Sequence, residues 1–415
     1  MSKGYKKFLL LWMGELISSI GGGLTSFGLG IYIFNETGSA AGMSLVTLLG
    51  FLPTLLLSVP AGVLADRFDR RLLMMIGDGC SGLGILFILI CMKSGDATLV
   101  QICIGVTVSA IFSSLLEPSY RSTITDILTK EEFSKANGLV SLAGSARYLF
   151  SPAIAGLLLT VSDISLLLII DICTFFVTIT ATAIVRKGVK TNHSTDRQPF
   201  FKSMKEGWQA VHGRKGVFLL IMVSSAITMF MGILQILEKP MILSFADSET
   251  LGIAESVCAC GMLAAALILG IFGIKKGYAS VLRISFFLAG IFMIGMSLIE
   301  NIIPICIFGF LFFAMLPITN NCMDYMARTN IPDELQGRAW GFIGFLSQLG
   351  YVVAYSVSGV AADGLASLTG KGVGRGAAIM IFISGILLAI TALTLLRLPE
   401  IKELENSKVQ EKMVA

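Results

Sequence analysis

The sequence predicts an all-α integral membrane protein with twelve transmembrane helices in two six-helix bundles. Three observations predict this fold. The 415 residues are 55% hydrophobic and only 14% charged, with a strongly positive mean hydropathy. Apolar stretches of about 20 residues, long enough to cross a hydrocarbon core about 30 Å thick, recur along the whole chain. One long polar stretch divides them into two sets. This composition excludes an ordinary soluble domain.

The first bundle is predicted at residues 1–185. Its apolar segments cover 8–34, 40–64, 72–92, 97–116, 138–161 and 164–185. The first segment follows Lys3, Lys6 and Lys7, as the apolar part of a secretory signal would. It is too long for a signal, and no small-residue cleavage site follows it. We therefore expect it to remain as the first membrane helix.

Residues 186–216 form the long polar stretch and are predicted to be a cytoplasmic linker. Eight basic residues lie there against two acids, Asp196 and Glu206. Within the linker, large apolar side chains recur at helical spacing among lysines, at Phe200, Phe201, Met204 and Trp208. This pattern predicts an amphipathic helix at the membrane surface. A flexible solvated loop is the alternative.

The second bundle is predicted at residues 217–398, followed by a cytoplasmic tail at 399–415. Its apolar segments cover 217–237, 251–274, 278–299, 302–322, 339–362 and 377–396. The stretch 118–138 resembles 317–341 in layout, with a proline, an acidic pair, an apolar residue and a glycine in the same order. A repeat spaced by about half the chain is expected when a transporter consists of two related six-helix halves.

The distribution of lysine and arginine predicts the orientation, because positively charged loops are retained in the cytoplasm. All but five of the 31 basic residues lie in loops or at helix ends on one side. The exceptions are Lys93, Lys239, Lys371, Arg375 and, within a helix, Arg147. The pattern predicts a multi-pass protein of the inner (cytoplasmic) membrane with both termini in the cytoplasm. The net charge of +4 therefore reflects topology and not nucleic-acid binding.

No arrangement typical of catalysis is found. The eight cysteines lie inside apolar segments without metal-ligand spacing, and both histidines, His193 and His212, lie in the linker. Phosphate-binding GxxxxGK[ST] and zinc-binding HExxH motifs are absent. The sequence therefore predicts a protein that is not an enzyme, with no cofactor and no metal site.

The most specific motif joins the second and third segments. It has the form GxxxDRxxRR and consists of Gly62, Asp66, Arg67, Arg70 and Arg71. This resembles the signature loop of the major facilitator superfamily. Gly62 permits close helix approach, and Asp66 can pair with a basic side chain or face a helix N-terminus across the bundle interface. Such a contact would hold one state of an alternating-access cycle, in which the two bundles move against each other. The arginines also anchor the topology.

Within that superfamily the chain resembles the macrolide-efflux branch of the drug:proton antiporters nearly end to end. The stretches that carry the resemblance are TGSA at 37–40, GFLP at 50–53, SPAIA at 151–155, MKEG at 204–207, GMLA at 261–264, GR at 337–338 and SGVAAD at 358–363. It implies a monomeric secondary-active exporter of hydrophobic or amphipathic compounds, macrolide-like drugs among them, coupled to protons.

Two other functions remain open. Siderophore and lipid exporters share parts of the same pattern, so an endogenous metabolite, lipid or siderophore is an alternative substrate. A transport-dead sensor or scaffold is a third possibility, against which the intact loop at 62–71 argues.

The fifth segment carries Pro152 and Gly156 in the sequence SPAIAG. This resembles the antiporter motif GPxxGG, with two glycines replaced by serine and alanine. A proline kinks a helix and small neighbours permit close packing, so an antiporter motif and an ordinary packing kink both explain it.

Charged residues inside the segments call for explanation, because each costs about 2.5–3.5 kcal/mol at the bilayer centre. Arg283 lies near a segment end and can snorkel. Asp78 and Asp171 lie on helices that the resemblance implies are peripheral, which favours structural pairing.

Glu15 and Arg147 lie on helices that the resemblance places near the central cavity. Glu15 is a candidate proton carrier or counter-ion for a cationic solute, or one half of a static salt bridge with Arg147. Glu255 aligns with an acid of the macrolide-efflux branch and is either an outer gate or a solvated helix-end acid. Ser109 stands where many proton-coupled relatives carry an arginine, which puts proton coupling in doubt; Arg147 is a candidate to take its place.

Overall fold

The computed structural model describes residues 2–95, 97–129, 132–187, 215–331, 333–395, 400–401 and 404–405. Side chains at 59, 134, 215 and 333–341 are not included in that description. The amphipathic helix predicted at 200–208 and most of the linker at 186–216 lie outside the described residues. So does the tail at 399–415, except for four of its residues. The described part is all-helical, as predicted.

The chain forms two compact units. Unit 1 comprises residues 1–196 and 246–256, and unit 2 comprises 197–245 and 257–415. Unit 1 contains α1 (Lys3–Thr37), α2 (Ala40–Arg67), α3 (Arg70–Ser94), α4 (Leu99–Ser113), α5 (Leu116–Ile127), α6 (Phe133–Val161) and α7 (Ile164–Arg186). Unit 2 contains α9 (Lys215–Leu243), α11 (Tyr278–Leu298), α12 (Ile302–Asn330), α13 (Asp333–Thr369) and α14 (Val373–Leu395), while α10 (Ser248–Phe272) begins in unit 1 and ends in unit 2.

Twelve spans in the described part are long and apolar enough to cross a membrane. Eleven of them lie in one helix each, and α4 and α5 together make the fourth, Leu99–Ile127. The prediction ended this span at 116 because Glu117, Arg121 and Asp126 interrupt the apolar run. In the structure the backbone turns at Ser114 and Leu115, and the helix then resumes. Its polar side chains are paired, with the Arg121 Nε donating to Glu117, so the helix extends beyond its apolar part.

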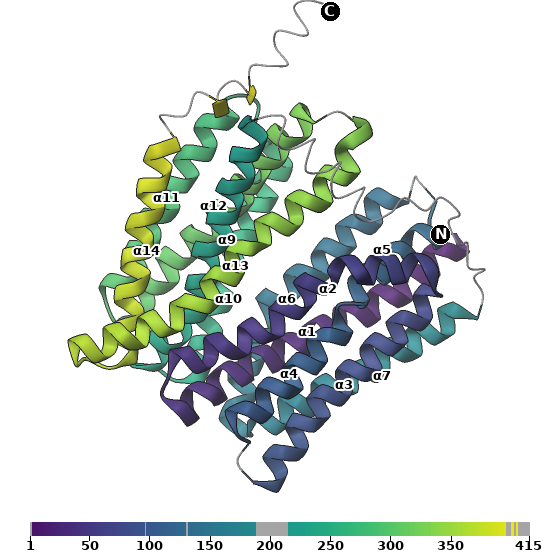
Figure 1. The fold of residues 1–415 in the computed structure, drawn as a ribbon, viewed down its shortest axis with the longest axis horizontal. Coiled ribbons are helices and arrows are strands. Elements are labelled where there is room, and N and C mark those ends of the chain that lie inside the picture. Colours follow the sequence, from purple (N-terminus) through teal and green to yellow (C-terminus); the bar gives the residue numbers. More distant parts are fainter. Residues whose placement is uncertain are drawn as a thin grey trace, which may run out of the picture. The chain divides into compact units, whose positions relative to one another are not determined.

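Unit 1 is built around α1, which packs against both α6 and α7 (Figure 1). α3 packs against α4 and α7, and small residues permit the close approach of α3 to α4. A Cβ at Gly84 would lie 2.5 Å from the Gly105 carbonyl oxygen, so any side chain there would force the helices apart. Close contact through small residues is the usual mode of packing between membrane helices.

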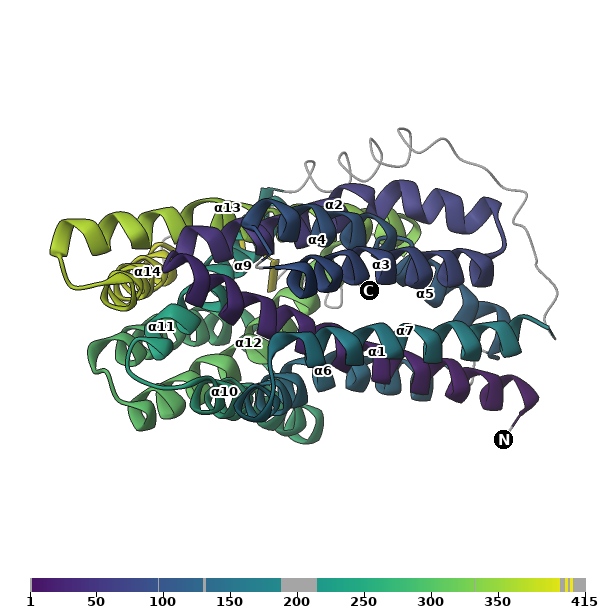
Figure 2. The ribbon, with the colours of Figure 1, turned by 90° about the horizontal axis from the view of Figure 1, so that it is seen from below.

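Unit 2 is built around two pairs of helices, visible in Figure 2: α9 against α13, and α11 against α14. A Cβ at Gly290 of α11 would lie 2.7 Å from the backbone of Gly385 and of Ala389 on α14. Between α9 and α13, the Tyr355 hydroxyl donates to Gln235 Oε1 at 2.7 Å. Both units therefore combine tight small-residue contacts with a few hydrogen bonds between helices.

Candidate functional site

The loop motif at 62–71 forms an ion-pair network at one end of unit 1. Asp126, at the end of α5, accepts from Arg70 Nη1 at 2.6 Å and from Arg71 Nη2 at 3.0 Å. Arg71 is 1% exposed, which makes it one of the largest fully buried side chains of the chain. Arg70 also donates to the backbone carbonyls of Ala65 and Ser122, at 3.2 Å each. Sequence analysis did not find Asp126, which lies more than fifty residues from its partners.

The other members of the motif are more exposed. Asp66 is 62% exposed, and its nearest basic atom is Arg70 Nη2 at 3.8 Å. Arg67 lies on the surface. Among the described residues, no atom lies within 4 Å of a Cβ built at Gly62, so the close helix packing expected there is not seen. The arginines, rather than Gly62 and Asp66, are thus the packed part of this loop.

Asp69, between the two helices, connects the loop to the end of α7. Its Oδ1 accepts from the backbone N–H of Arg71 at 3.1 Å, which caps α3, and its Oδ2 accepts from Arg186 Nε at 2.7 Å. A carboxylate at this position satisfies a free N–H of the first turn and interacts favourably with the helix dipole. Asp69 and Arg186 were not predicted as site residues.

Glu15 and Arg147 lie on adjacent helices without forming an ion pair. Arg147 packs its side chain over Gly23 of α1 and donates from Nη2 to Ser26 Oγ at 3.1 Å. Glu15 and Ser26 are about 16 Å apart along α1 at helical rise. The guanidinium that binds Ser26 therefore points away from Glu15. Within the described part of the chain, no basic nitrogen lies within 4.0 Å of the half-buried Glu15 carboxyl. Glu15 and Arg147 therefore do not form a salt bridge in this structure.

Asp78 on α3 and Asp171 on α7 lie inside unit 1 and are 3% and 2% exposed. They are close enough to repel each other, and threonines of α1 and α7 surround them. Neither has an ion-pair partner among the residues described. Sequence analysis predicted structural pairing for them.

Ser109, at the position where an arginine was expected, belongs to a cluster of hydroxyls between α3 and α4. The Ser81 hydroxyl lies 2.7 Å from Ser109 Oγ and 3.0 Å from Ser113 Oγ. Ser81 is 1% exposed. The three serines satisfy one another, and a long basic side chain would not fit this close contact.

The turn of α6 that contains Pro152 contacts the first turns of α10, which belong to unit 1. The N–H of Ala153, next to Pro152, donates to Ser256 Oγ at 3.2 Å. A Cβ at Gly156 would lie 2.6 Å from the Ser248 carbonyl oxygen and 3.3 Å from Gly252 Cα. The predicted kink residues thus permit a very close helix crossing. Glu255 lies half-buried in the same stretch of α10.

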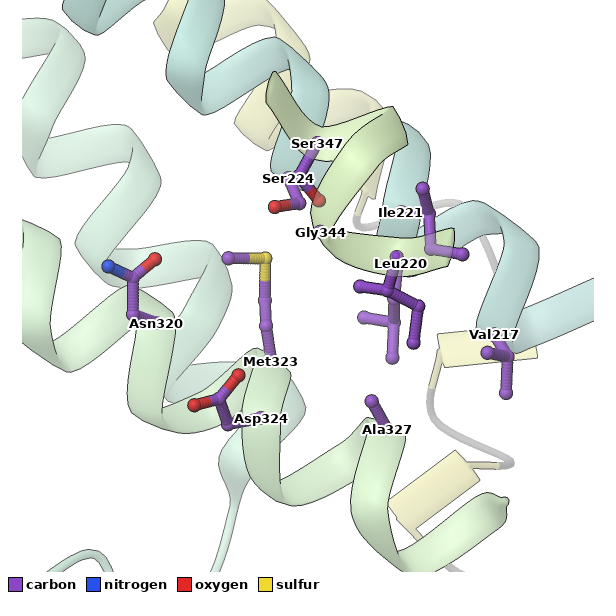
Figure 3. Close-up of a pocket in the computed structure, with 11 residues that line it drawn as sticks. Val217, Leu220, Ile221, Ser224, Asn320, Met323, Asp324, Ala327, Gly344 and Ser347 are labelled. Carbon is purple, nitrogen blue, oxygen red and sulfur yellow. The ribbon is translucent and has the colours of Figure 1, made fainter. Parts of the chain in front are cut away.

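Unit 2 contains a cavity of about 190 Å³ between α9, α12 and α13. Figure 3 shows its lining, which includes Asn320, Met323 and Asp324 from α12. The polar groups of the wall are completed by Ser224 and Ser347, and the rest is aliphatic. The Ser347 hydroxyl is buried and makes no hydrogen bond within the described structure. An apolar cavity with a few converging polar groups is the usual form of a small-molecule site.

Two acids of unit 2 were missed because the predicted segments ended at 237 and 322. Glu238 lies within α9 and is 4% exposed, with the Cys258 thiol 3.9 Å from its Oε1. Asp324 lies in the last third of α12 and lines the cavity. Continuing each apolar segment past its first acid, at helical periodicity, would have found both.

Outside the membrane spans, Asp247 caps α10. Its Oδ1 accepts from the backbone N–H of Thr250 at 2.9 Å. This hydrogen bond to the charged form lowers the pKa of Asp247 below its ordinary value.

The Major Facilitator Superfamily model matches residues 11–355 of the chain, which is more than half of it. The chain belongs to the major facilitator superfamily. It is therefore a multi-pass membrane transporter of a family whose members bind small-molecule substrates.

Two curated relatives resemble the chain over most of their length. Macrolide efflux protein A of Streptococcus pyogenes is 27% identical over 372 residues, covering 86% of this chain and 89% of the relative. The Staphyloferrin A transporter of Staphylococcus aureus is 25% identical over 345 residues, covering 82% and 84%.

Solved structures show the same fold at low sequence identity. A bacterial homologue of the iron transporter ferroportin, in an inward-facing state, is 12% identical and superposes with a TM-score of 0.74 over 95% of this chain and 99% of that one. The nucleoside transporter NupG gives the same TM-score and identity over 94% and 99%. These similarities extend to the fold alone.

Proposed function

We propose that the protein is a secondary-active exporter of hydrophobic or amphipathic compounds, macrolide-like drugs among them, which it exchanges for protons by alternating access. The likeness to Macrolide efflux protein A over 86% of the chain carries this proposal. The cavity in unit 2 supports a contact with part of such a compound only: its Asp324 carboxyl and two serine hydroxyls suit a basic group, but its volume of about 190 Å³ is below that of a drug-sized site.

In this proposal the protein is a monomer in the inner membrane with both termini in the cytoplasm. The supporting observation is the concentration of lysine and arginine on one side of the predicted spans. The bundles at 1–185 and 217–398 move against each other, joined by the linker at 186–216. The loop at 62–71 then lies at the cytoplasmic end, where its exposed Asp66 is available to a partner in one state of the cycle.

Glu15 is the proposed proton carrier, with Arg147 and Glu255 as further candidates for contact with protons or substrate. Two observations support Glu15. Its carboxyl is half-buried within a membrane span and has no ion pair among the described residues. In addition, α4 carries Ser109, in contact with Ser81, at the position where many proton-coupled relatives carry an arginine. The kink at Pro152 and Gly156 is proposed to seal one side of the pathway.

The test is transport by the purified protein in vesicles with an imposed pH gradient and a radiolabelled macrolide. We expect Glu15→Gln to lower gradient-driven flux to the level of vesicles without protein, because the variant carries no exchangeable proton at this site. Glu36→Gln, at the exposed end of the same helix, is the matched control and should transport as the wild type does. Unchanged flux in Glu15→Gln would remove Glu15 from the coupling role.

A second candidate substrate is a siderophore or related metabolite. The likeness to the Staphyloferrin A transporter, at nearly the same identity and coverage, favours it. Deleting the gene and measuring the siderophores released into the medium separates the two. Normal siderophore release together with increased macrolide sensitivity would support drug export.

A further inference from the structure

A groove of about 440 Å³ follows the seam between α1 and α7 in unit 1. The two helices pack side by side, with the start of α1 against the end of α7 (Figures 1 and 2). Phe8 and Val185 lie in one hydrophobic cluster at that end. The groove begins beside them and extends along α1 from Leu10 to Ile17, a distance of about 10 Å at helical rise.

The sizes of the side chains along the seam shape this groove. Gly14 and Ala181 form its floor and are buried, and a Cβ at Gly14 would lie 3.5 Å from Ala181 Cβ, in ordinary van der Waals contact. Its walls are large, exposed apolar side chains, at Met13, Ile17, Phe176, Val177 and Ile184. Thr180 also lines the groove, but its hydroxyl donates to the Phe176 carbonyl at 2.7 Å. The groove therefore offers apolar contact along its length.

Lysines continue the two helix faces that line the groove. On α1, Lys3 and Lys6 precede Leu10 by seven and four residues, so they lie on the same face of the helix as Leu10. On α7, Lys187 follows Ile184 by three residues. All three lysines are exposed, and none forms an ion pair with another described residue. One end of the groove is therefore positively charged.

The dimensions of the groove match one leaflet of a bilayer. A hydrocarbon core about 30 Å thick gives each leaflet about 15 Å, and the interfacial layer adds about 5–8 Å on each side. Lys6 precedes the start of the groove at Leu10 by about 6 Å, and the groove extends about 10 Å further. The lysines thus lie at the level of lipid phosphates when the groove lies in hydrocarbon. Asp69 and Asp126, at the same end, are already paired with arginines.

We propose that the groove between α1 and α7 binds one acyl chain of an anionic phospholipid, whose phosphate contacts Lys3, Lys6 and Lys187. Charge complementarity selects this occupant. Basic residues at the membrane surface attract anionic lipids, and a basic pocket between membrane helices suits their headgroups. The apolar walls hold the chain and the lysines select the headgroup. The site does not depend on which compound is exported.

The test is fluorescence quenching of the full chain in bilayers by phosphatidylglycerol or phosphatidylcholine with brominated acyl chains. Phe176→Trp places a reporter in the groove wall, and the signal of the three native tryptophans is subtracted. We expect phosphatidylglycerol to bind there about tenfold or more tightly than phosphatidylcholine. Phe287→Trp is the control, because Phe287 is exposed on α11, nine residues from the helix start, and Lys275 and Lys276 precede that helix. Its preference should stay within about threefold.

Variants in the Phe176→Trp background separate the headgroup from the chain. Lys3→Gln with Lys6→Gln should remove most of the preference for phosphatidylglycerol, whereas Lys275→Gln with Lys276→Gln should leave it unchanged. Gly14→Leu fills the floor of the groove and should lower the quenching by both lipids. Gly22→Leu is its matched control on the same helix, because no atom lies within 4 Å of a Cβ built at Gly22. If Gly14→Leu does not fold, Thr180→Phe fills the groove from its exposed wall instead.

Equal quenching of Phe176→Trp by the two lipids would overturn the proposal, and so would an equal preference at Phe287→Trp. Relief of the quenching by a macrolide, added in amounts comparable to the protein, would assign the groove to the exported compound instead. Quenching that rises steeply when the protein is diluted in lipid would assign it to a second copy of the chain. None of these measurements follows transport. Failure of Glu15→Gln to affect export would therefore leave this inference standing.

Discussion

The third span of each half begins in a different way. In unit 1, α3 is capped by its neighbour Asp69, which also accepts from Arg186 at the end of the sixth span. In unit 2, α11 is preceded by Gly277, whose φ of 78° favours a residue without a side chain, and no local side chain caps the helix. Instead Glu405, beyond the sixth span, accepts from the backbone N–H groups of Gly277 at 2.7 Å, Tyr278 at 3.1 Å and Ala279 at 3.2 Å.

The two units also differ in the contact between their third and fourth spans. In unit 1 it is ionic, from Arg70 and Arg71 to Asp126. In unit 2 the first residue of α11, Tyr278, stacks on Tyr325 of α12, with ring centroids 3.7 Å apart and planes 6° from parallel. Both halves thus tie the start of the third span to the end of the sixth span or to the segment after it, through Arg186 and Asp69 in unit 1 and through Glu405 in unit 2.

The largest effect is expected from breaking the ionic contact of unit 1. Asp126→Ala leaves Arg71, which is 1% exposed, without its carboxylate, and removal of one partner from a buried pair costs about 3–5 kcal/mol. Thermal unfolding of the purified protein measures this loss. Asp66→Ala is the control, because Asp66 is 62% exposed and should contribute under about 1 kcal/mol. Equal losses from the two variants would mean that the network at Asp126 is not structural.

Breaking the remote cap of unit 2 should cost less. Glu405→Ala removes three hydrogen bonds from α11, but water can replace part of them, so we expect a loss of about 1–3 kcal/mol. The Tm of this variant is compared with that of Glu300→Ala, whose carboxylate makes only a 3.7 Å contact with Arg375. A Tm for Glu405→Ala that matches the control would show that the C-terminal segment does not hold α11.

The smallest effect concerns the cap of α10. The hydrogen bond from Thr250 lowers the pKa of Asp247 in the folded protein. The ionised Asp247 carboxylate therefore stabilises the fold fully above the unfolded pKa of about 3.9, and this stabilisation is lost as the pH falls through the lower, folded pKa. Asp247→Asn keeps a good capping side chain but removes the titration. Unfolding curves of both proteins between pH 5 and 2.5 should converge at the acid end. If the two curves instead stayed parallel, ionised Asp247 would not stabilise the start of α10.

The sequence predicted the helices well because spanning a bilayer imposes a length and a composition that are visible residue by residue. It placed the ends less well. Glu117, Arg121 and Asp126 look like a loop by hydropathy, yet α5 extends through them because helix geometry and α3 supply their partners.

The site was less accessible for a related reason. Arg70 and Arg71 were visible as a motif, but a motif does not show that its partner is Asp126, since that contact exists only after α3 and α5 pack. Glu405 lies in the polar tail, whose composition does not predict a contact with the start of α11. Asp171 was visible as a charge inside an apolar segment, but not the threonines that lie beside it.

The remote cap on α11 sets an order on biosynthesis. The Glu405 carboxylate that caps this helix lies 128 residues after Gly277 in the chain. The cap on α3 is local, because Asp69 comes directly before that helix. At about 5–20 residues per second, α11 emerges roughly 6–26 s before Glu405 is made. For that time its first turn must be satisfied by water, lipid headgroups or the insertion machinery. A stop codon just before residue 405 would make that interim state permanent.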